Sequence, residues 1–503
     1  LHLMMKTLRQ ISIYIVVMIV FSIYGCRKES SKIAADNSNW SVYLGGDNSN
    51  QFASLKQINR TNVDRLKVAW TYHSSSGDSK NFSQIQCNPL IIDGILFGTS
   101  PELMLFAINA ETGKLIWEFD PDVNEEFSQH VNRGVSYWQH GDDKRIFFSA
   151  GSNFFAINAD TGESIPTFGI DGIVSLKTGL GERSQDSYVV ARTPGIIYKN
   201  LLIIGSVVSE TMGAATGHIR AFNTISGEME WIFHTIPQPG ELGYETWPKE
   251  AYTYSGGANN WAGMSLDLER GIVYCPTGSA AYDFWGGNRK GENLFANCLI
   301  ALDAKTGERI WHYQTVHHDI WDKDLPAPPN LIQVERNGKK VDAVAQISKQ
   351  GYVFLFDRES GRSLFPIDEV PVPVSDLKGE YSWPTQPVPQ LPPPLVPQVI
   401  DKDKVTDIDS ISNLYVGNIL ITVRTGNLFL PPSSQGTIIF PGVDGGAEWG
   451  GAAADAENGI IYVNSNIMPW IHMMVPLGEQ NGESSVAGRN DYLKNCAVCH
   501  GQY

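Results

Sequence analysis

The stretch "LFAINAETGKLIWEF", residues 105–119, contains the pattern that decides the fold. An apolar run ends in Asn109, a Thr-Gly pair follows, and a second run carrying Trp117 completes the unit. Asparagine accepts backbone hydrogen bonds inside a turn, and glycine adopts positive φ without strain. The stretch therefore predicts two antiparallel strands joined by a tight turn.

Four more stretches repeat this strand–turn–strand unit, each with Asn or Asp ahead of the turn. They are "FFAINADTGESIPTF" (154–168), "IRAFNTISGEMEWIF" (219–233), "LIALDAKTGERIWHY" (299–313) and "VFLFDRESGRSLFPI" (353–367). Successive turn glycines lie 49 to 80 residues apart, from 113 to 162 and from 227 to 307 at the extremes. That spacing suits one four-stranded blade per unit, with insertions, and predicts an all-β β-propeller. Ordinary hairpins in an unrelated β fold are the alternative, which five copies disfavour.

The composition is that of a globular chain rich in turns. Among 503 residues, 42% are hydrophobic and 18% charged, with 48 glycines and 27 prolines. These values exclude a disordered chain and favour short strands. The net charge of -16 argues against a nucleic-acid partner, and solubility alone also explains it. The proline-dense residues 366–398 are interpreted as a long loop on the propeller, and residues 401–415 as the place of a short helix.

The N-terminal segment predicts export from the cytoplasm. Lys6 and Arg9 precede an apolar run, residues 11–23, that is short for a membrane span and fits a signal peptide over residues 1–25. Gly25 before Cys26 resembles a bacterial lipobox, in which the cysteine is lipidated. Residues 26–38 then form a flexible tether. A plain cleaved signal and an uncleaved anchor are the alternatives.

The C-terminal stretch "CAVCHGQY" contains a Cys-x-x-Cys-His run. This run predicts covalent haem attachment through Cys496 and Cys499, with His500 as the proximal iron ligand. A zinc site is the alternative, although one such run is a poor zinc set. We therefore expect residues 488–503 to begin a small α-helical cytochrome c domain. Cys275 and Cys298 leave open a disulfide, for which sequence alone gives no geometry.

Most of the chain resembles the quinoprotein dehydrogenases, most nearly their membrane-type glucose dehydrogenase branch. The resemblance rests on "WSVYLGGDNSNQFASLKQINRTNVDRLKVAW" (40–70), "HVNRGVSYW" (130–138), "YQTVHHDIWDKDLPAPPNL" (313–331), "SKQGYVFLFDRESG" (348–361) and "GGAEWGGAAADAENGIIYVNS" (445–465). It implies an eight-bladed propeller over residues 39–487 that binds pyrroloquinoline quinone (PQQ) and a divalent cation. Counting repeat units gives about six blades, so the resemblance also implies that the propeller is incomplete here and that further blades follow the cytochrome segment.

The stretch "HHDIWDKD", residues 317–324, is the expected catalytic loop. So many ionisable residues repel one another unless a cation or a cofactor neutralises them. The resemblance implies that Asp322, directly after Trp321, is the base that takes an alcohol proton. Asp324 then adds an oxygen to the cation, and His130 matches an active-site histidine of the glucose branch. A solvated acidic loop is the alternative.

The cation needs oxygen ligands. The resemblance places Glu210 at the position of a calcium-binding glutamate in alcohol-oxidising relatives. Ser279 stands where those relatives carry an asparagine, and serine is a shorter and poorer ligand. The cation is therefore expected to rely on Asp322, Asp324 or water as well. Calcium is the expected ion and magnesium the alternative.

PQQ carries three carboxylates on a flat ring, so cations and aromatic faces suit it. By the resemblance, Arg133 lies near the quinone oxygens, Lys349 hydrogen-bonds the ring and Trp261 forms the floor on which the ring stacks. Trp449 lies where backbone groups meet the cofactor, and Gln86 stands in place of a glutamate. Taken singly, the tryptophans fit packing between blades and the lysine fits a surface position.

The expected substrate is an aldose sugar, with a polyol or alcohol as the alternative. Relatives that oxidise simple alcohols carry two adjacent cysteines where this chain has Phe127 and Ser128. Electrons would pass from reduced PQQ to haem c and then to a membrane quinone or a cytochrome. The whole implies a lipid-anchored periplasmic enzyme. Its rival is a non-enzymatic propeller scaffold of the outer-membrane assembly type, which has no need of the catalytic loop, Arg133 or Lys349.

Overall fold

The computed structural model describes residues 39–74, 84–122, 131–211, 213–400, 405–456 and 458–476. The predicted signal peptide and tether, with Cys26, lie outside these ranges, as do His130 and the haem residues Cys496, Cys499 and His500. In the described part, no helix has both the length and the apolar character that a membrane crossing requires.

Four antiparallel sheets of four strands follow one another along the described chain, and a three-stranded sheet comes fifth. The first sheet contains β1 (Leu90–Ile92), β2 (Ile95–Thr99), β3 (Leu105–Asn109) and β4 (Leu115–Phe119), and the second contains β5 (Ser136–His140), β6 (Asp143–Ala150), β7 (Asn153–Asn158) and β8 (Ile173–Ser175). The third contains β10 (Ile196–Tyr198), β11 (Leu201–Ile204), β13 (Ile219–Asn223) and β14 (Met229–Phe233), and the fourth contains β15 (Ser265–Asp267), β16 (Ile272–Pro276), β17 (Cys298–Asp303) and β18 (Arg309–Gln314). The fifth contains β19 (Asn330–Arg336), β20 (Lys339–Ile347) and β21 (Val353–Asp357).

Two-stranded ribbons and short helices complete the described elements. The ribbons are β9 (Val189–Val190) with β12 (Val207–Val208), β22 (Ile367–Pro371) with β23 (Thr385–Pro389), β24 (Thr437–Ile439) with β27 (Trp470–His472), and β25 (Ala447–Asp455) with β26 (Ile460–Ser465). The helices are η1 (Tyr43–Gly45), η2 (Val63–Arg65), η3 (Glu182–Ser184), η4 (Tyr244–Thr246), η5 (Ala251–Thr253) and α2 (Ser410–Leu420).

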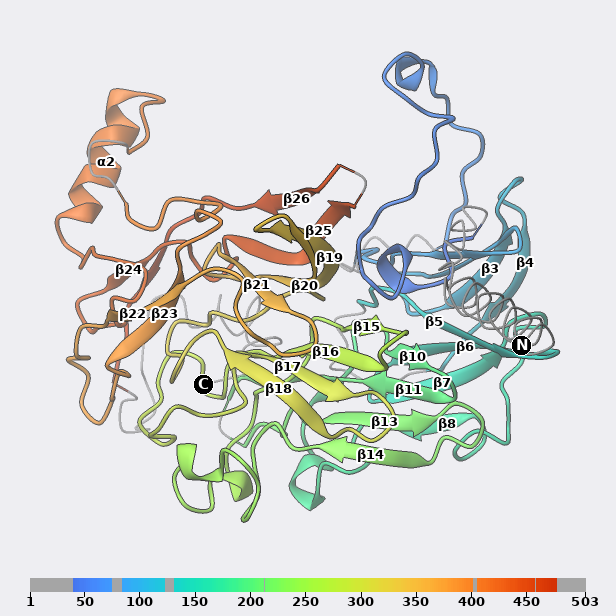
Figure 1. Ribbon diagram of the computed structural model, residues 1–503, viewed down its shortest axis with the longest axis horizontal. Helices are drawn as coiled ribbons and strands as arrows, with labels where there is room; N and C mark the ends of the chain where they lie inside the picture. Colours follow the sequence, from blue (N-terminus) through green and yellow to red (C-terminus); the bar gives the residue numbers. More distant parts are fainter. Residues whose placement is uncertain are drawn as a thin grey trace, which may run out of the picture. The chain divides into compact units, whose positions relative to one another are not determined.

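The sheets are arranged as successive blades around one region. Strand β5 contacts β10, β10 contacts β15, β15 contacts β19, and β19 contacts β25, so the first strands of consecutive sheets lie next to one another (Figure 1). Within a sheet, order in space follows order in sequence. This radial repetition confirms the expected all-β propeller.

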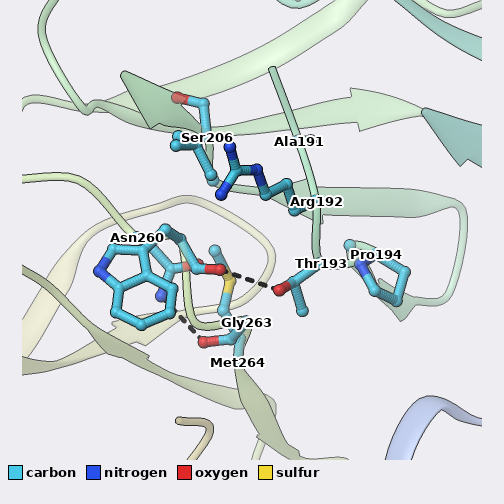
Figure 2. Close-up of a pocket in the computed structure, with 12 residues that line it drawn as sticks. Ala191, Arg192, Thr193, Pro194, Ser206, Asn260, Gly263 and Met264 are labelled. Atoms are coloured by element: carbon cyan, nitrogen blue, oxygen red, sulfur yellow. Dashed lines mark hydrogen bonds between the residues drawn. The ribbon is translucent and has the colours of Figure 1, made fainter. Parts of the chain in front are cut away.

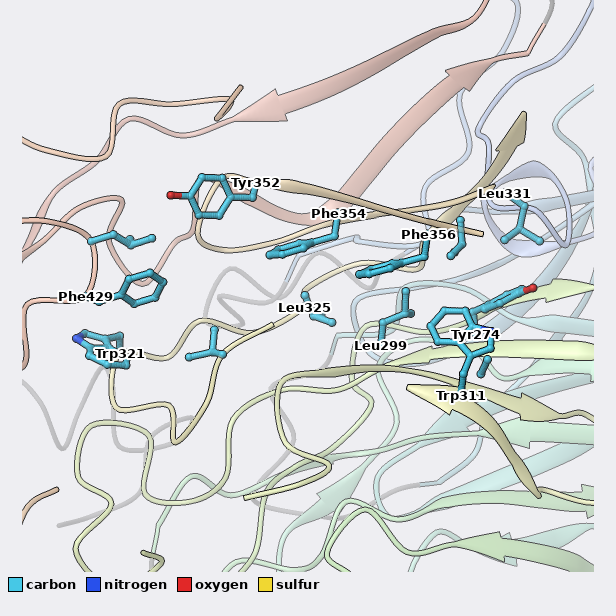
Figure 3. Packing of buried hydrophobic residues seen from close by; sticks show 14 of the residues in the cluster. Tyr274, Leu299, Trp311, Trp321, Leu325, Leu331, Tyr352, Phe354, Phe356 and Phe429 are labelled. Carbon is cyan, nitrogen blue, oxygen red and sulfur yellow. The ribbon is translucent and has the colours of Figure 1, made fainter. Parts of the chain in front are cut away.

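Apolar clusters between consecutive sheets hold the blades together. The cluster between the fourth and fifth sheets contains Tyr274, Leu299 and Trp311 on one side and Phe354 and Phe356 on the other (Figure 3). The second to fifth sheets therefore each bury both faces between neighbours, which explains the nearly continuous apolar runs of their inner strands. Burying such side chains is worth about 1.5–3 kcal/mol each and dominates the stability of the fold.

The repeated turn closes each blade as the sequence predicts. In the first sheet, Asn109 Oδ1 accepts the N–H groups of Glu111 and Thr112 at 3.1 and 2.9 Å. The Gly113 N–H donates to the Asn109 carbonyl at 2.8 Å, and Gly113 has φ +68°. Asp303 accepts from two backbone N–H groups in the same way in the fourth sheet.

Tryptophans join neighbouring blades at these turn glycines. The ring of Trp117, on β4, lies on Gly162 of the second sheet, where an added Cβ would stand 2.7 Å from it. Its indole N–H donates to the Ala159 carbonyl at 3.1 Å. Trp311 of β18 makes the same contact with Gly361 of the fifth sheet. A side chain at either glycine would displace the ring and separate the blades.

Two of the five units depart from the simple hairpin. In "FFAINADTGESIPTF", only an isolated bridge joins Ile157 to Ser164, and β8 pairs with β7 instead. In the fifth unit, Ser363 makes one bridge to Phe356. Pro166 and Pro366 follow these bridges closely, and proline provides no N–H for a continuing ladder.

The segment before the first sheet runs along the inner strands of later sheets. The Leu266 N–H of β15 donates to the Asp47 carbonyl at 2.8 Å. The Leu331 N–H of β19 donates to the Asn48 carbonyl at 3.0 Å, and the Ala454 N–H of β25 donates to Asn50 at 2.8 Å. Backbone groups of this segment thus fix three blades against one another.

The structure decides three smaller points that the sequence raised. The proline-dense stretch contains the ribbon β22–β23, so its description as a loop was wrong in part; a ribbon of two edge strands tolerates proline. Helix α2 begins within the expected range, capped by Asp409, whose carboxylate accepts the Ser412 N–H at 2.8 Å. Cys275 and Cys298 are free thiols, so the disulfide is absent.

Candidate active site

The predicted site residues come from two kinds of place in the blades. Six lie in or beside the segment that leads into an inner strand: Gln86 before β1, Arg133 before β5, Trp261 before β15, Asp322 and Asp324 before β19, and Trp449 in β25. The other described ones lie between the second and third strands of the third, fourth and fifth sheets: Glu210, Ser279 and Lys349. Because those inner strands are neighbours, residues more than 350 positions apart in sequence (86 to 449) meet at one end of them.

The predicted catalytic loop, residues 317–324, is anchored in the core by Trp321. Its side chain is fully buried against Phe429, and its indole N–H donates to the Leu430 carbonyl at 3.0 Å (Figure 3). Side chains then alternate. Lys323 Nζ donates to the Pro441 carbonyl at 2.6 Å, whereas Asp322 and Asp324 lie on the other side. Asp322 has φ +55°, a strained conformation that the anchored neighbours enforce.

Lys349 pairs with the predicted base. Its Nζ lies 3.0 and 2.9 Å from the two carboxylate oxygens of Asp322, 3.8 Å from Asp324 and 4.0 Å from Glu448. Burial raises the pKa of Asp322 well above its usual range, and Lys349 opposes that rise. Burial lowers the pKa of Lys349, but the carboxylates outweigh it and leave the pKa well above normal. The neighbouring carboxylates therefore favour the charged form of Lys349.

Asp324 is held rigidly from two sides. Its Oδ2 accepts the Trp261 indole N–H at 2.7 Å, and its Oδ1 accepts the Ser279 N–H at 2.7 Å. The Ser279 hydroxyl lies 2.9 Å from the same Oδ1 and 2.5 Å from Asp319 Oδ2. Asp319 Oδ2 also accepts the side-chain amide N–H of Asn297 at 2.8 Å. Ser279 thus positions a carboxylate, which is a different contribution from that of an additional ligand.

Four carboxylates form what we call the acidic cluster: Glu210, Asp283, Asp322 and Asp324. Asp283 is 6% exposed, and burial together with the charges of Glu210, Asp322 and Asp324 raises its pKa well above the usual range. Among the described residues, no three His, Cys, Asp or Glu side chains share a geometry ready for a metal ion. The donor chemistry nevertheless fits a hard divalent cation, because buried carboxylates repel until a positive charge joins them.

Arg133 lies against two aromatic rings. Its guanidinium carbon is 4.4 Å from the ring centre of Trp449 and 5.3 Å from that of Trp261. Its Nε donates to Gln86 Oε1 at 3.1 Å, and Thr193 Oγ1 lies 3.5 Å from Nη1. Burial lowers the pKa of Arg133 to about 10, so it stays charged near neutral pH. The arrangement offers a planar cation and flat apolar faces to an anionic aromatic ligand.

A small cavity adjoins the Trp261 segment. Arg192, Thr193, Ser206 and Met264 are among its lining residues, and Thr193 Oγ1 donates to the Trp261 carbonyl at 2.9 Å (Figure 2). Its volume of about 10 Å³ admits at most one water molecule. A flat cofactor therefore has no room there. The Trp261 ring also faces two cations, with the Arg133 guanidinium carbon 5.3 Å and Lys349 Nζ 5.8 Å from its centre.

Sequence reasoning missed two acidic residues of this site. Asp283 lies in "PTGSAAYDFWGG" and Glu448 in "AEWGG", both within stretches singled out for other residues. Burial raises the pKa of Glu448, with Lys349 and Arg133 acting in the other direction. Acidic residues inside otherwise apolar, glycine-rich stretches were the available signal. His130 cannot be placed, because it lies outside the described residues.

Comparison with known proteins gives the family. The family model described as "PQQ: Glucose/ethanol/alcohol dehydrogenase, beta-propeller domain" matches residues 40–498. The quinoprotein glucose dehydrogenase of Escherichia coli (strain K12) is 32% identical over 467 residues, which cover 88% of this chain and 58% of that protein. The quinate/shikimate dehydrogenase (quinone) of Acinetobacter baylyi is 30% identical over 466 residues, covering 87% of this chain and 57% of that protein. The chain thus spans a little under three fifths of the length of both relatives.

Solved structures show the same fold. The quinohemoprotein alcohol dehydrogenase from Comamonas testosteroni superposes with a TM-score of 0.65 at 22% identity, covering 86% of this chain and 58% of that one. A europium-containing methanol dehydrogenase gives a TM-score of 0.63 at 19% identity, covering 86% and 70%. Sequence match and fold agree, and the chain belongs to the family of PQQ-dependent glucose, ethanol and alcohol dehydrogenases, within its β-propeller domain.

Proposed function

We propose that this chain carries the substrate-oxidising site of a PQQ-dependent dehydrogenase acting on an aldose sugar, with a polyol or alcohol as the next candidate. One observation supports this most strongly: Lys349 holds both carboxylate oxygens of Asp322 within 3.0 Å, next to an Asp324 fixed by Trp261. A merely solvated acidic loop would be exposed, whereas Trp321 is fully buried and Asp324 is 8% exposed.

The residues present fit PQQ and a divalent cation. Trp261 offers a ring face, while Arg133, Lys349 and Gln86 offer donors to an anionic heterocycle, with Trp449 at its edge. The acidic cluster would hold the cation, with Ser279 keeping Asp324 in place. Calcium suits such carboxylate ligands, and magnesium is the alternative. The chemistry that the bound quinone supplies is acceptance of the hydride lost by the substrate carbon.

Proton transfer falls to Asp322. Its carboxylate accepts the substrate hydroxyl proton while the carbon–hydrogen bond breaks, so the alcohol carbon becomes a carbonyl carbon. Lys349 favours the ionised carboxylate that this step requires. Because the buried Trp321 fixes the loop, the backbone position of Asp322 is set before substrate binds.

Electron removal is proposed to use the C-terminal motif. Cys496 and Cys499 would attach haem c and His500 would bind the iron, so the two electrons leave one at a time to a quinone or a cytochrome. Lipid on Cys26 would hold the protein on the periplasmic side of a bacterial membrane. Both proposals rest on residues outside the described structure and on sequence chemistry alone.

The rival proposal is a non-enzymatic propeller scaffold. A scaffold gains nothing from burying like-charged carboxylates, because each such group destabilises the fold by several kcal/mol unless it is compensated. The acidic cluster is therefore the feature that favours an enzyme.

A substrate panel tests the proposal. Protein loaded with PQQ and calcium is given aldoses, polyols, quinate and primary alcohols, with a reducible dye as the artificial acceptor. We expect dye reduction that needs PQQ and is greatest with an aldose. If no compound reduces the dye although PQQ is bound, the enzymatic assignment is wrong.

A further inference from the structure

A second group of buried charged side chains, all of them basic, lies in and beside the third sheet. Arg220, on β13, is 0% exposed. Its Nη1 donates to the carbonyls of Leu176 and Thr178, the latter at 3.0 Å. Its Nε and Nη2 are buried and have no hydrogen-bond partner within the described ranges. Among the described residues, no carboxylate forms an ion pair with this guanidinium.

Other basic side chains and hydroxyl groups lie in the segments next to this strand. Thr216, His218 and Arg220 follow one another at two-residue intervals as the chain enters β13, a spacing that puts side chains on one face of an extended chain. Arg183, from η3, donates through Nη2 to the Ser255 carbonyl at 2.7 Å, and its Nη1 is buried without a partner. The Thr216 and Ser255 hydroxyls are also buried and unpartnered. We call Arg183, His218 and Arg220 the basic cluster.

The basic residues of this cluster are close enough to affect one another. His218 is fully enclosed, and burial, with further contributions from His234, Arg220 and Arg183, lowers its pKa well below the usual range. The neutral imidazole of His218 accepts the Thr235 N–H at 3.1 Å. The histidine thus avoids a charge, whereas Arg220 cannot: burial lowers its pKa to about 9, which still leaves it protonated at neutral pH.

A buried guanidinium without a counter-charge destabilises a fold strongly. The free Nε–Nη2 edge is the geometry that binds an oxyanion through two parallel hydrogen bonds. Water would satisfy the donors but not the charge. An anion satisfies both.

We propose that the basic cluster binds one small inorganic anion on the Nε–Nη2 edge of Arg220, with Arg183 Nη1 and the hydroxyls of Thr216 and Ser255 as further donors. The chemical class is a halide or a tetrahedral oxyanion such as sulfate or phosphate.

The site connects to the segment that carries Trp261. Ser255 begins that segment, and the Gly257 N–H donates to the Ala215 carbonyl at 3.1 Å, while the Gly217 N–H donates to Gly257 at 2.9 Å. The Ala258 N–H then donates to the Ser279 carbonyl at 2.7 Å. A bound anion would fix the start of the segment whose end forms the candidate cofactor floor.

Arg145 provides a matched control. It is 4% exposed on β6, its Nη2 pairs with Asp143 at 2.7 Å, and its Nη1 donates to the Thr224 and Ile225 carbonyls at 2.9 and 3.0 Å. It is therefore a buried arginine in a similar strand whose charge is already balanced within the chain.

The first test is anion-dependent stability. Melting temperature is measured against sulfate and against chloride, at constant ionic strength maintained with a bulky organic anion, for the wild type, Arg220→Met and Arg145→Met. We expect a saturable rise of about 2–4 °C in the wild type and in Arg145→Met, and none in Arg220→Met. The same rise in Arg220→Met would overturn the proposal.

The second test needs no variant to fold. Wild-type crystals grown with bromide or with selenate should show an anomalous peak within hydrogen-bond distance of Arg220 Nε and Nη2. A peak with selenate alone assigns the oxyanion, and a peak with bromide assigns the halide. Absence of both peaks, with water in their place, overturns the proposal.

Discussion

The acidic cluster and the basic cluster both bury charged side chains inside the β-propeller, but the charges are of opposite sign. The first places four carboxylates around one lysine, and the second places two arginines where no carboxylate pairs with them among the described residues. Both contact the same segment, through Trp261 at its end and Ser255 at its start. The comparison shows that the net charge of a buried cluster, rather than its polarity, indicates whether the cluster binds an ion. The sign of that net charge indicates whether the ion is a cation or an anion.

Replacing Asp322, the proposed base, should have the largest effect of any change in the acidic cluster. Asp322→Asn keeps the size of the side chain and removes its ability to accept a proton. We expect turnover to fall by about 10²–10⁴-fold, with PQQ still bound. Steady-state kinetics on cation-saturated protein measure it, and a variant that retains most of the wild-type rate would remove Asp322 from that role.

Cation affinity tests whether the cluster is one site. Asp283→Asn removes a negative charge but keeps an oxygen, so the calcium concentration that gives half-maximal activity should rise by about 10–100-fold. Asp342→Asn is the control, because Asp342 pairs with Arg270 at 2.6 Å in the fifth sheet. Equal calcium requirements in the wild type and in Asp283→Asn would show that Asp283 is not part of the site.

The Lys349–Asp322 pair predicts a pH effect. Lys349 lowers the pKa of Asp322, and the base works when ionised. In Lys349→Met that pKa should therefore rise, and the acidic limb of the pH–turnover curve should move to higher pH by about one unit. The curve is measured with calcium and PQQ saturating. An unmoved acidic limb would mean that the lysine does not act on the base.

Asp47 is a third case, a single half-buried carboxyl group outside both clusters. Burial raises its pKa to about 6 from 3.8. The raised pKa means that the protonated form is favoured in the fold, so its contribution is present below about pH 4 and is lost as pH rises through 6. Relative to Asp47→Asn, the wild type should lose a few degrees of melting temperature across that window. Parallel melting curves at pH 4 and 7 would contradict the assignment.

Sequence predicted the fold well because its signal is local. Each unit of about fifteen residues contains the Asn or Asp before the turn and the glycine at positive φ. Where a unit contains a tryptophan, as at Trp117 and Trp311, that ring packs on the turn glycine of the next blade. Pro166 and Pro366 break two hairpins, a consequence that the repeat pattern concealed. Numbers of strands per blade depend on such local interruptions.

The sequence predicted some residues of the candidate site and missed others. Arg133, Trp261, Asp322 and Lys349 could be named because short motifs carry them, and the structure brings them together. Asp283 could not, since its importance depends on three carboxylates from other blades. Arg220 gave no signal either. In "IRAFN" it reads as one polar residue in a strand. Only the fold shows that, within the described part of the chain, no carboxylate pairs with it.

Equilibrium binding of PQQ is the sharpest test of whether Trp261 and the acidic cluster together form a site for PQQ and a cation. Quenching of tryptophan fluorescence is followed as PQQ is added, with calcium present or chelated, for the wild type, Trp261→Ala and Trp138→Phe, whose tryptophan lies on β5 in the second sheet. With calcium present, we expect the wild type to bind one equivalent of PQQ. Binding should be at least about tenfold weaker in Trp261→Ala or after chelation of calcium, and Trp138→Phe should keep the wild-type affinity. Binding that is indifferent both to Trp261 and to calcium would contradict this expectation.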